Sequence, residues 1–337
     1  MKVVKAMKEK MLAFMMYLGE NQWNDSPTRP NHNWMVYSNK LHCDKKVWRE
    51  IAEKAVEYGF NTVFIPTVDG LKYKTHPEIA VEGAWEVEEL KEELDYLRKI
   101  GLTPIPELNF STAHDAWLGK YSRMVSTPIY YQVARDIIHE LIDIFDQPEL
   151  FMLDMDEENH LNQKHFDFVC YRQHELLWHD TLFFLECVRE KGVRPWMYCD
   201  RYVHEPEKFV NEVGKDVVVS PWYYLNLYED TETTLPKLGD PIDVDNYNAF
   251  MLGKIDSYTS LPEHGYDVIP TASNCFRDYN IDHTVRYCVE KIPYDKLMGI
   301  AIAPWCGPTI EKNKYGYFKS FAETKAAIEK YTKGGKL

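Results

Sequence analysis

Short apolar runs alternate along this chain with longer segments in which apolar residues recur every three or four positions. The short runs have the length and composition of strands that are buried on both faces, and the longer segments have the periodicity of amphipathic helices. Eight runs are predicted as strands: 11–18, 61–67, 102–108, the apolar beginning of 150–160, 193–199, 216–222, 266–272 and 298–305.

The helical segments carry recognisable start and stop residues. The first should begin after Asp44 as N-cap and end at Gly59, with Val47, Ile51 and Ala55 on one buried face. The same kind of pattern predicts further helices within 86–101, 128–145 and 179–192.

Strands that alternate with helices indicate a parallel α/β fold, and eight of them favour a closed (β/α)8 TIM barrel over an open sheet. No glycine-rich phosphate loop follows any of the runs, which disfavours a nucleotide-binding fold. We expect one barrel domain over residues 1–337. The segment 223–265 is helix-poor at its start and should form a long insertion over one face.

Composition narrows the range of partners. The formal net charge is −14, and no basic cluster occurs apart from the two ends of the chain, so we expect neither nucleic acid nor a membrane as partner. Aromatic residues make up 14%, with 23 Tyr and 9 Trp. Such an excess is typical of carbohydrate-binding sites, although a tyrosine-rich core and surface would also explain it. The oligomeric state stays open.

Seven cysteines occur without a CxxC pair, which argues against a zinc site. We expect mostly buried free thiols and a cytoplasmic, reducing compartment. The apolar stretch 11–19 is too short for a membrane span and reads as the first strand, with a processed leader as the open alternative.

Polar and aromatic residues follow the predicted strands, where the active sites of barrel enzymes lie. The fourth strand ends in Asp154, Asp156, Glu157 and Glu158. We expect Asp154 to be buried and hydrogen-bonded, Asp156 and Glu157 to face a substrate, and Glu158 to be solvated. Each of these acids alone could be an ordinary loop residue. The other strand-end candidates, predicted to bind substrate in a cleft, are Glu107, His114, Asp200, Trp222, Tyr223, Asn274 and Trp305.

Four stretches resemble the β-N-acetylhexosaminidases, family 20 of the glycoside hydrolases. "GLTPIPELNFSTAHDAW" is similar to the third-strand segment of that family, in which a Pro-Glu step closes the strand and a His follows. "LFMLDMDEEN" is similar to its fourth strand, whose hallmark is an Asp-Glu pair. "FLECVREKGVRPWMYCD" and "GIAIAPW" resemble its fifth and eighth strand regions, the latter with the Trp that floors the sugar site.

The chain also departs from that pattern. "LDMDE" stands where the family usually has two glycines before the pair, and "FIPTVD" replaces a segment that usually carries a His. The family's first-strand Arg has no clear counterpart, and Arg29 is the candidate for it.

The resemblance implies a retaining glycosidase in which the 2-acetamido group of the sugar attacks the anomeric carbon. Glu157 would then be the general acid and Asp156 the carboxylate that orients the acetamido nitrogen. No cofactor and no resident metal are expected.

Three alternatives remain open from the residues. Glu157 could work with Glu107, Asp200 or Asp278 as the second carboxylate. The barrel could bind glycans without catalysis. It could also be a divalent-metal-dependent enzyme, for which the possible ligands are Glu107, His114, Asp154, Asp156, Asp200 and His204.

Overall fold

Eight strands form the centre of the molecule in a computed structural model that describes residues 9–31, 35–164, 166–225, 244–305 and 309–337. Every strand lies within one of the predicted runs, so the strand prediction is confirmed. The strands are β1 Met11–Met15, β2 Thr62–Pro66, β3 Thr103–Glu107, β4 Leu150–Met152, β5 Arg194–Tyr198, β6 Val218–Ser220, β7 Thr271–Ala272 and β8 Gly299–Ile302.

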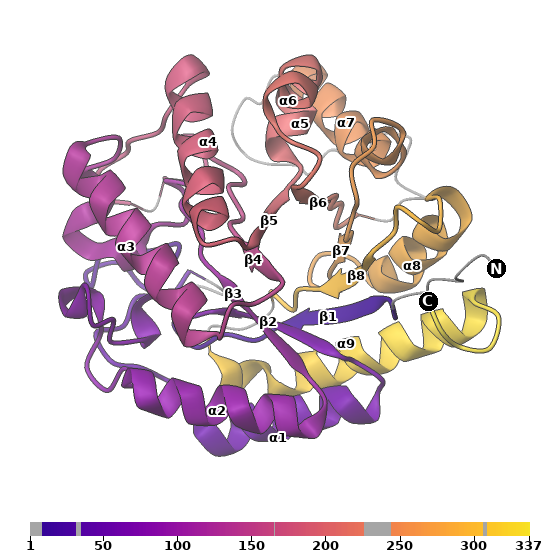
Figure 1. Cartoon of the computed structure of the whole chain (residues 1–337), viewed down its shortest axis with the longest axis horizontal. Coiled ribbons are helices and arrows are strands. Elements are labelled where there is room, and N and C mark those ends of the chain that lie inside the picture. The colour runs from indigo at the N-terminus through magenta and orange to yellow at the C-terminus, as the bar shows by residue number, and fades with distance from the viewer. Residues whose placement is uncertain (1–8, 32–34, 165, 226–243, 306–308) are drawn as a thin grey trace.

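The strands are parallel and pair in the order β6-β5-β4-β3-β2-β1-β8-β7. Backbone hydrogen bonds also join the two edges of this sheet: Val219 N–H donates to the Asp267 carbonyl, and Ile269 N–H donates to the Val219 carbonyl, both at 3.1 Å. Helices surround the strands (Figure 1). The predicted (β/α)8 barrel is therefore confirmed.

The helices follow the strands in sequence. Asp44 caps α1 as predicted, because its carboxylate accepts hydrogen bonds from the backbone N–H groups of Lys46 and Val47. Gly59 follows that helix with φ 89°, a conformation that favours glycine. The helices are α1 Lys45–Glu57, α2 Val87–Ile100, α3 Pro128–Ile144, α4 His174–Glu190, α5 Asp200–His204, α6 Pro206–Glu212, α7 Val244–Glu263, α8 Asn280–Lys291 and α9 Ile310–Tyr331.

Much of the predicted insertion, residues 226–243, lies outside the described residues. The remainder of the segment 223–265 is largely α7, the helix between β6 and β7. Among the described residues, no helix is long and apolar enough to cross a membrane.

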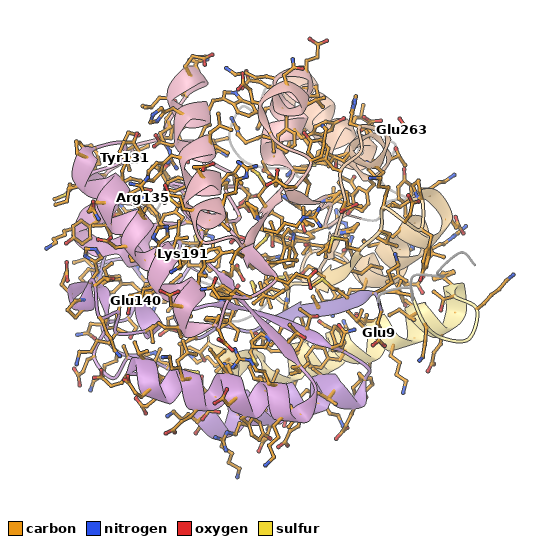
Figure 2. All side chains as sticks on the ribbon, in the orientation of Figure 1. Glu9, Tyr131, Arg135, Glu140, Lys191 and Glu263 are labelled. Atoms are coloured by element: carbon orange, nitrogen blue, oxygen red, sulfur yellow. The ribbon has the colours of Figure 1, made fainter. Side chains whose placement is uncertain are left out.

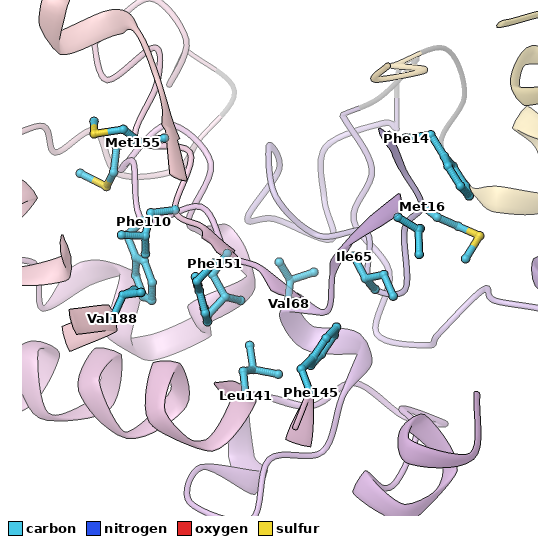
Figure 3. Packing of buried hydrophobic residues seen from close by; sticks show 14 of the residues in the cluster. Phe14, Met16, Ile65, Val68, Phe110, Leu141, Phe145, Phe151, Met155 and Val188 are labelled. Atoms are coloured by element: carbon cyan, nitrogen blue, oxygen red, sulfur yellow. The ribbon is translucent and has the colours of Figure 1, made fainter. Parts of the chain in front are cut away.

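Apolar side chains pack in two layers. Along β1, Ala13 and Met15 point into the barrel, whereas Phe14 and Met16 pack between the strands and the helices. Figure 3 shows part of this outer layer, including Phe14 and Met16. The alternation decides which strand-end residues reach the barrel interior.

Charged side chains cover the outer helices, as Figure 2 shows for Arg135 and Lys191. Arg135 pairs with Glu190 at 3.0 Å, and Lys191 with Asp143 at 2.7 Å. Exposed pairs of this kind contribute little to stability.

The expectation of free thiols is only partly met. Cys43, Cys170, Cys187, Cys199 and Cys288 are free, but Cys275 is in a disulfide. Cys306 lies outside the described residues. Cysteine spacing alone could not predict this bond, because a disulfide needs two cysteines that the fold brings close together.

The pairing of β1 with β8 depends on a glycine. Gly299 pairs with Met11, and a Cβ atom at Gly299 would lie 2.1 Å from the Met11 carbonyl oxygen. We expect Gly299→Ala to lower the free energy of unfolding by about 1–3 kcal/mol, because the two backbones would have to move apart. Urea unfolding measures the change.

Gly253→Ala is the matched control, because the new Cβ would lie 2.8 Å from a side-chain carbon of Val203 and no closer than 3.9 Å to a backbone atom. Its effect should be smaller, since alanine also favours the helix. Equal unfolding midpoints for wild type and Gly299→Ala would contradict the prediction.

Candidate active site

The chain leaves β4 through a strained turn. Asp154, Met155 and Glu157 have φ angles of 51°, 60° and 54°, in the left-handed region that L-residues rarely adopt. Asp154 and Met155 stand at the two positions where the family that "LFMLDMDEEN" resembles usually has glycine. The backbone thus keeps a glycine-like conformation without glycine, and surrounding contacts must stabilise it.

A buried ion pair holds this turn. The Glu158 carboxylate accepts hydrogen bonds from Arg172 Nη2 at 2.6 Å and Nε at 2.9 Å, and from the Thr112 backbone N–H at 3.1 Å. Both side chains of the pair are at most 2% exposed. The prediction that Glu158 is solvated is therefore wrong. A carboxylate can be buried here because the Arg172 guanidinium compensates its charge.

Asp156 is buried against His114. Its Oδ1 atom lies 3.1 Å from His114 Nδ1 and accepts a hydrogen bond from Asn109 Nδ2 at 2.8 Å. Burial alone would raise the pKa of Asp156, but the charge and hydrogen bond of His114 outweigh it and hold the pKa below its usual value. Burial alone would lower the pKa of His114, but Asp156 and Glu157 raise it to about 10. The two groups therefore form an aspartate–imidazolium pair at neutral pH.

Glu157 lies on the other side of the same imidazole and reaches outward. Its Oε2 atom is 3.5 Å from His114 Nε2, and its side chain is 39% exposed. Its backbone N–H donates to Asp200 Oδ1 at 3.2 Å. Of the two adjacent acids, Asp156 is thus enclosed and Glu157 is accessible.

Glu107 and Asp154 form a second acidic pair, deeper in the barrel. Their side chains hydrogen-bond to each other, and both residues are at most 2% exposed. Burial raises the pKa of each carboxyl group, and nearby Asp156 adds to the effect. The pair therefore favours a shared proton at neutral pH, as adjacent buried acids generally do. The prediction of a buried, hydrogen-bonded Asp154 agrees with this geometry.

Asp200 connects the turn to the sixth strand. Its Oδ2 atom accepts hydrogen bonds from Trp222 Nε1 at 2.8 Å and from Lys254 Nζ at 2.7 Å. Lys254 belongs to α7, is almost fully buried, and lies 3.4 Å from the centre of the Trp222 ring. This cation–π contact and ion pair fix the orientation of the Trp222 ring.

Four half-buried aromatic rings lie in sequence from His114 to Asp200, and we call them the aromatic arc: Trp23, Trp305, Tyr224 and Trp222. Consecutive ring centroids are 6.1, 6.4 and 4.9 Å apart. Trp23 lies 5.7 Å from the His114 ring at one end, and Trp222 bonds to Asp200 at the other. Because His114 and Asp200 both contact the turn after β4, the aromatic arc borders Asp156 and Glu157.

The barrel mouth thus brings together most of the predicted site residues: Glu107, His114, Asp156, Glu157, Asp200, Trp222 and Trp305. Two others lie elsewhere. Tyr223 is 3% exposed and packs in the layer between strands and helices, because neighbours in an extended segment point in opposite directions. Asn274 donates to Glu323 Oε2 on α9 at 2.9 Å.

Other candidates are also placed apart from this group. Asp278 is 78% exposed and pairs with Lys319 at 3.2 Å. Arg29 binds Asp167 at 3.2 Å, in the long segment after β4. His204 stacks on Phe250. Asp278 is therefore a poor second carboxylate, and Arg29 is held by a surface contact.

Four residues of the site were not among the predicted site residues: Trp23, Asn109, Tyr224 and Lys254. The first three follow strands, so their position was a usable signal. Lys254 is a single lysine in the largely apolar stretch 249–255, and that isolation was its only sequence signal.

His114, Asp156 and Glu157 are the one group of described residues that could hold a metal ion, since one ligand atom from each lies within 4.8 Å of the others. The raised pKa of His114 keeps a proton on each ring nitrogen, and a metal would have to displace one. Each ring nitrogen of His114 faces a carboxylate, at 3.1 and 3.5 Å, and this arrangement is that of an ion pair.

Comparison with known proteins gives no match to any family model and none to any curated protein. Solved structures do match. The β-N-acetylhexosaminidase of Bacteroides fragilis has a TM-score of 0.60 at 13% identity, over 93% of this chain and 65% of that chain. The exo-β-N-acetylglucosaminidase of Vibrio harveyi has a TM-score of 0.59 at 14% identity, over 94% and 54%. The β-hexosaminidase of Streptomyces plicatus has a TM-score of 0.56 at 11% identity, over 93% and 62%.

The chain is thus similar in fold to the enzymes that its strand-end motifs resemble. It spans about half to two thirds of their length. At these identities the likeness shows a shared barrel fold, and activity has to be argued from the site.

The pairing of His114 predicts a pH dependence of stability. Folding raises the pKa of His114 from 6.5 to about 10, so its contribution is complete below about pH 6.5 and is lost as the pH rises through about 10. His114→Asn should therefore be much less stable than wild type near pH 6, and the difference should shrink towards pH 10. Urea unfolding of both proteins at several pH values measures it.

His264→Asn is the control, since His264 is exposed at the end of α7. Its stability should follow that of wild type at every pH. A constant difference between wild type and His114→Asn over the whole range would contradict the proposed imidazolium.

Proposed function

We propose that the protein is a retaining glycoside hydrolase that acts on 2-acetamido sugars, with Glu157 as general acid/base and Asp156 as the stabilising carboxylate. One observation carries this proposal. Two adjacent acids have opposite environments: Asp156 is buried and held as an anion by His114, whereas Glu157 is accessible beside it. A proton donor and a permanent anion at one bond are what this reaction needs.

The first step would form a bond between the acetamido carbonyl oxygen and the anomeric carbon as the glycosidic bond breaks. Glu157 donates its proton to the departing oxygen. Asp156 accepts a hydrogen bond from the acetamido N–H and stabilises the positive charge that develops on the nitrogen. Water then attacks the anomeric carbon, its proton returns to Glu157, and the acetamido group is released with retention of configuration.

The aromatic arc supports a carbohydrate substrate. Rings offer flat apolar faces on which the C–H faces of a sugar can stack, while nearby carboxylates accept hydrogen bonds from its hydroxyl groups. The relatives in the comparisons are hexosaminidases by name, and their shared fold agrees with this substrate class. The structural likeness supports the proposal without assigning the residues.

Glu157→Gln keeps the shape of the side chain but removes its proton. We expect kcat/KM to fall by about 10²–10⁴-fold on aryl N-acetyl-β-glucosaminides, most for poor leaving groups, because these need protonation. Asp278→Asn is the control, because Asp278 is exposed and paired with Lys319. Undiminished activity of Glu157→Gln on a substrate with a poor leaving group would exclude Glu157 as the acid.

Asp156→Asn should impair only substrates that carry the 2-acetamido group, because its proposed partner is the acetamido nitrogen. The measurement is kcat/KM on paired aryl glycosides with and without that group. Equal losses on both members of the pair would show that Asp156 acts only through Glu157 or the local fold.

An inactive wild type would decide between the proposal and a binding function. If no glycoside is hydrolysed but N-acetylglucosamine binds in a calorimetric titration, the barrel is a glycan-binding protein.

An active wild type allows a test for a metal. Activity that is lost with EDTA and restored by a divalent ion would favour a metal-dependent enzyme at His114, Asp156 and Glu157.

A further inference from the structure

Three polar side chains, Glu107, Asp154 and Tyr198, lie inside the barrel just below Asp156 and Glu157. Glu107 continues the inward alternation of Ile105, and Asp154 continues that of Met152. Tyr198 belongs to the interior cluster itself, and its backbone N–H donates to the Asp154 carbonyl at 3.0 Å. Glu107 lies in register with Met152 on β4. The three residues therefore come from neighbouring strand ends and face the same interior space.

These side chains have few partners within the protein. Apart from the proton that the two acids share, Glu107 Oε2 and Asp154 Oδ1 accept no hydrogen bond from a described residue, and the buried Tyr198 hydroxyl has no hydrogen-bond partner among the described residues. The residues are 1%, 2% and 1% exposed. A buried polar atom without a partner is costly, and a group of them indicates a missing ligand.

One level deeper in the barrel, the polar side chains do have hydrogen-bond partners. Trp196 Nε1 donates to Ser220 Oγ at 2.9 Å, and Ser220 Oγ lies 3.2 Å from Thr271 Oγ1. Polar atoms deep in the barrel are therefore paired within the protein. The three residues lie one level higher, close to Asp156.

Backbone strain points to the same residue. Asp154 keeps φ 51°, although glycine would adopt this angle more easily. Asp154 thus combines an unfavourable backbone angle with a buried carboxyl group. Such a combination is typical of residues retained for function.

We propose that Glu107, Asp154 and Tyr198 form the floor of the sugar site. They would determine the specificity for the sugar by binding one hydroxyl group of the residue whose glycosidic bond is cleaved. A hydroxyl group can accept a hydrogen bond from the Tyr198 phenol and donate one to a carboxyl oxygen of the Glu107–Asp154 pair. The floor thus deepens the proposed function and rests on it. The floor would bind the sugar in place of Arg29, the candidate for the family's sugar-binding Arg, because Arg29 pairs with Asp167.

The test combines Tyr198→Phe with monodeoxy substrates. We expect wild type to lose about 10–100-fold in kcat/KM on one of the 3-, 4- and 6-deoxy aryl N-acetyl-β-glucosaminides, because the floor is then left unpaired. Tyr198→Phe should lose a similar factor on the parent sugar. On that one deoxy sugar the variant should lose little more, since the hydrogen bond is already absent.

Asp154→Asn should show the same selectivity for the same hydroxyl group. Tyr130→Phe is the matched control, because Tyr130 also has a buried, unpaired hydroxyl but lies on α3 in the helix layer. It should leave kcat/KM unchanged on all substrates.

Thermal unfolding separates binding from structure. Removing an unpaired buried hydroxyl should leave the Tm of Tyr198→Phe equal to or above that of wild type. If Tyr198→Phe has a lower Tm and loses kcat/KM equally on the parent and every deoxy sugar, the proposed sugar-binding role of the floor is wrong. The proposed function would not be affected by that result. Unchanged kcat/KM on all substrates would also overturn the role of the floor.

If wild type hydrolyses none of these glycosides, the proposed function fails and binding tests the floor separately. Calorimetric titration with N-acetylglucosamine and its deoxy analogues should then show that Tyr198→Phe weakens binding of the parent but not of one analogue. Equal weakening for all of the sugars, or for none, would overturn the floor as well.

Discussion

The buried ion pair between Glu158 and Arg172 is the constraint on which the candidate site depends. It fastens the end of a turn with three left-handed residues, so the turn cannot relax towards an ordinary loop conformation. Arg172 also pairs with Asp180 of α4 at 3.0 Å, which ties the turn to the helix layer. The orientations of Asp156 and Glu157 follow from this attachment, because both lie between the end of β4 and Glu158.

Crowded acids become useful at this barrel mouth because each has a different environment. Glu158 is neutralised by an arginine, Asp156 by an imidazolium, and Glu107 and Asp154 by sharing a proton. Glu157 is the most exposed of these acids, with 39% of its side chain accessible. The repulsion expected among like charges is thus distributed over separate partners, and the proposed function assigns the proton transfer to the accessible acid, Glu157.

Strand ends were a good guide to the site, and their limits have physical causes. Residues two apart on a strand share a face, so Glu107 and Trp305 could be placed from their strands. At the end of β6 the same alternation separates neighbours: Trp222 and Tyr224 share a face, and Tyr223, which was predicted to bind substrate, points away. Asn274 follows β7 but turns to α9, because Glu323 offers a partner that lies far away in the sequence.

The sequence by itself determined the class of fold, the eight strands and the position of the acidic turn, because hydrophobic periodicity and helix caps are local properties. Only the tertiary structure decided the state of each acid. Arg172 reaches Glu158 from 14 residues further along the same segment between β4 and α4. His114 and Lys254 reach Asp156 and Asp200 from other parts of the barrel, over separations that no local pattern encodes. Charge state depends on burial and on such distant partners, and both arise only when the barrel closes.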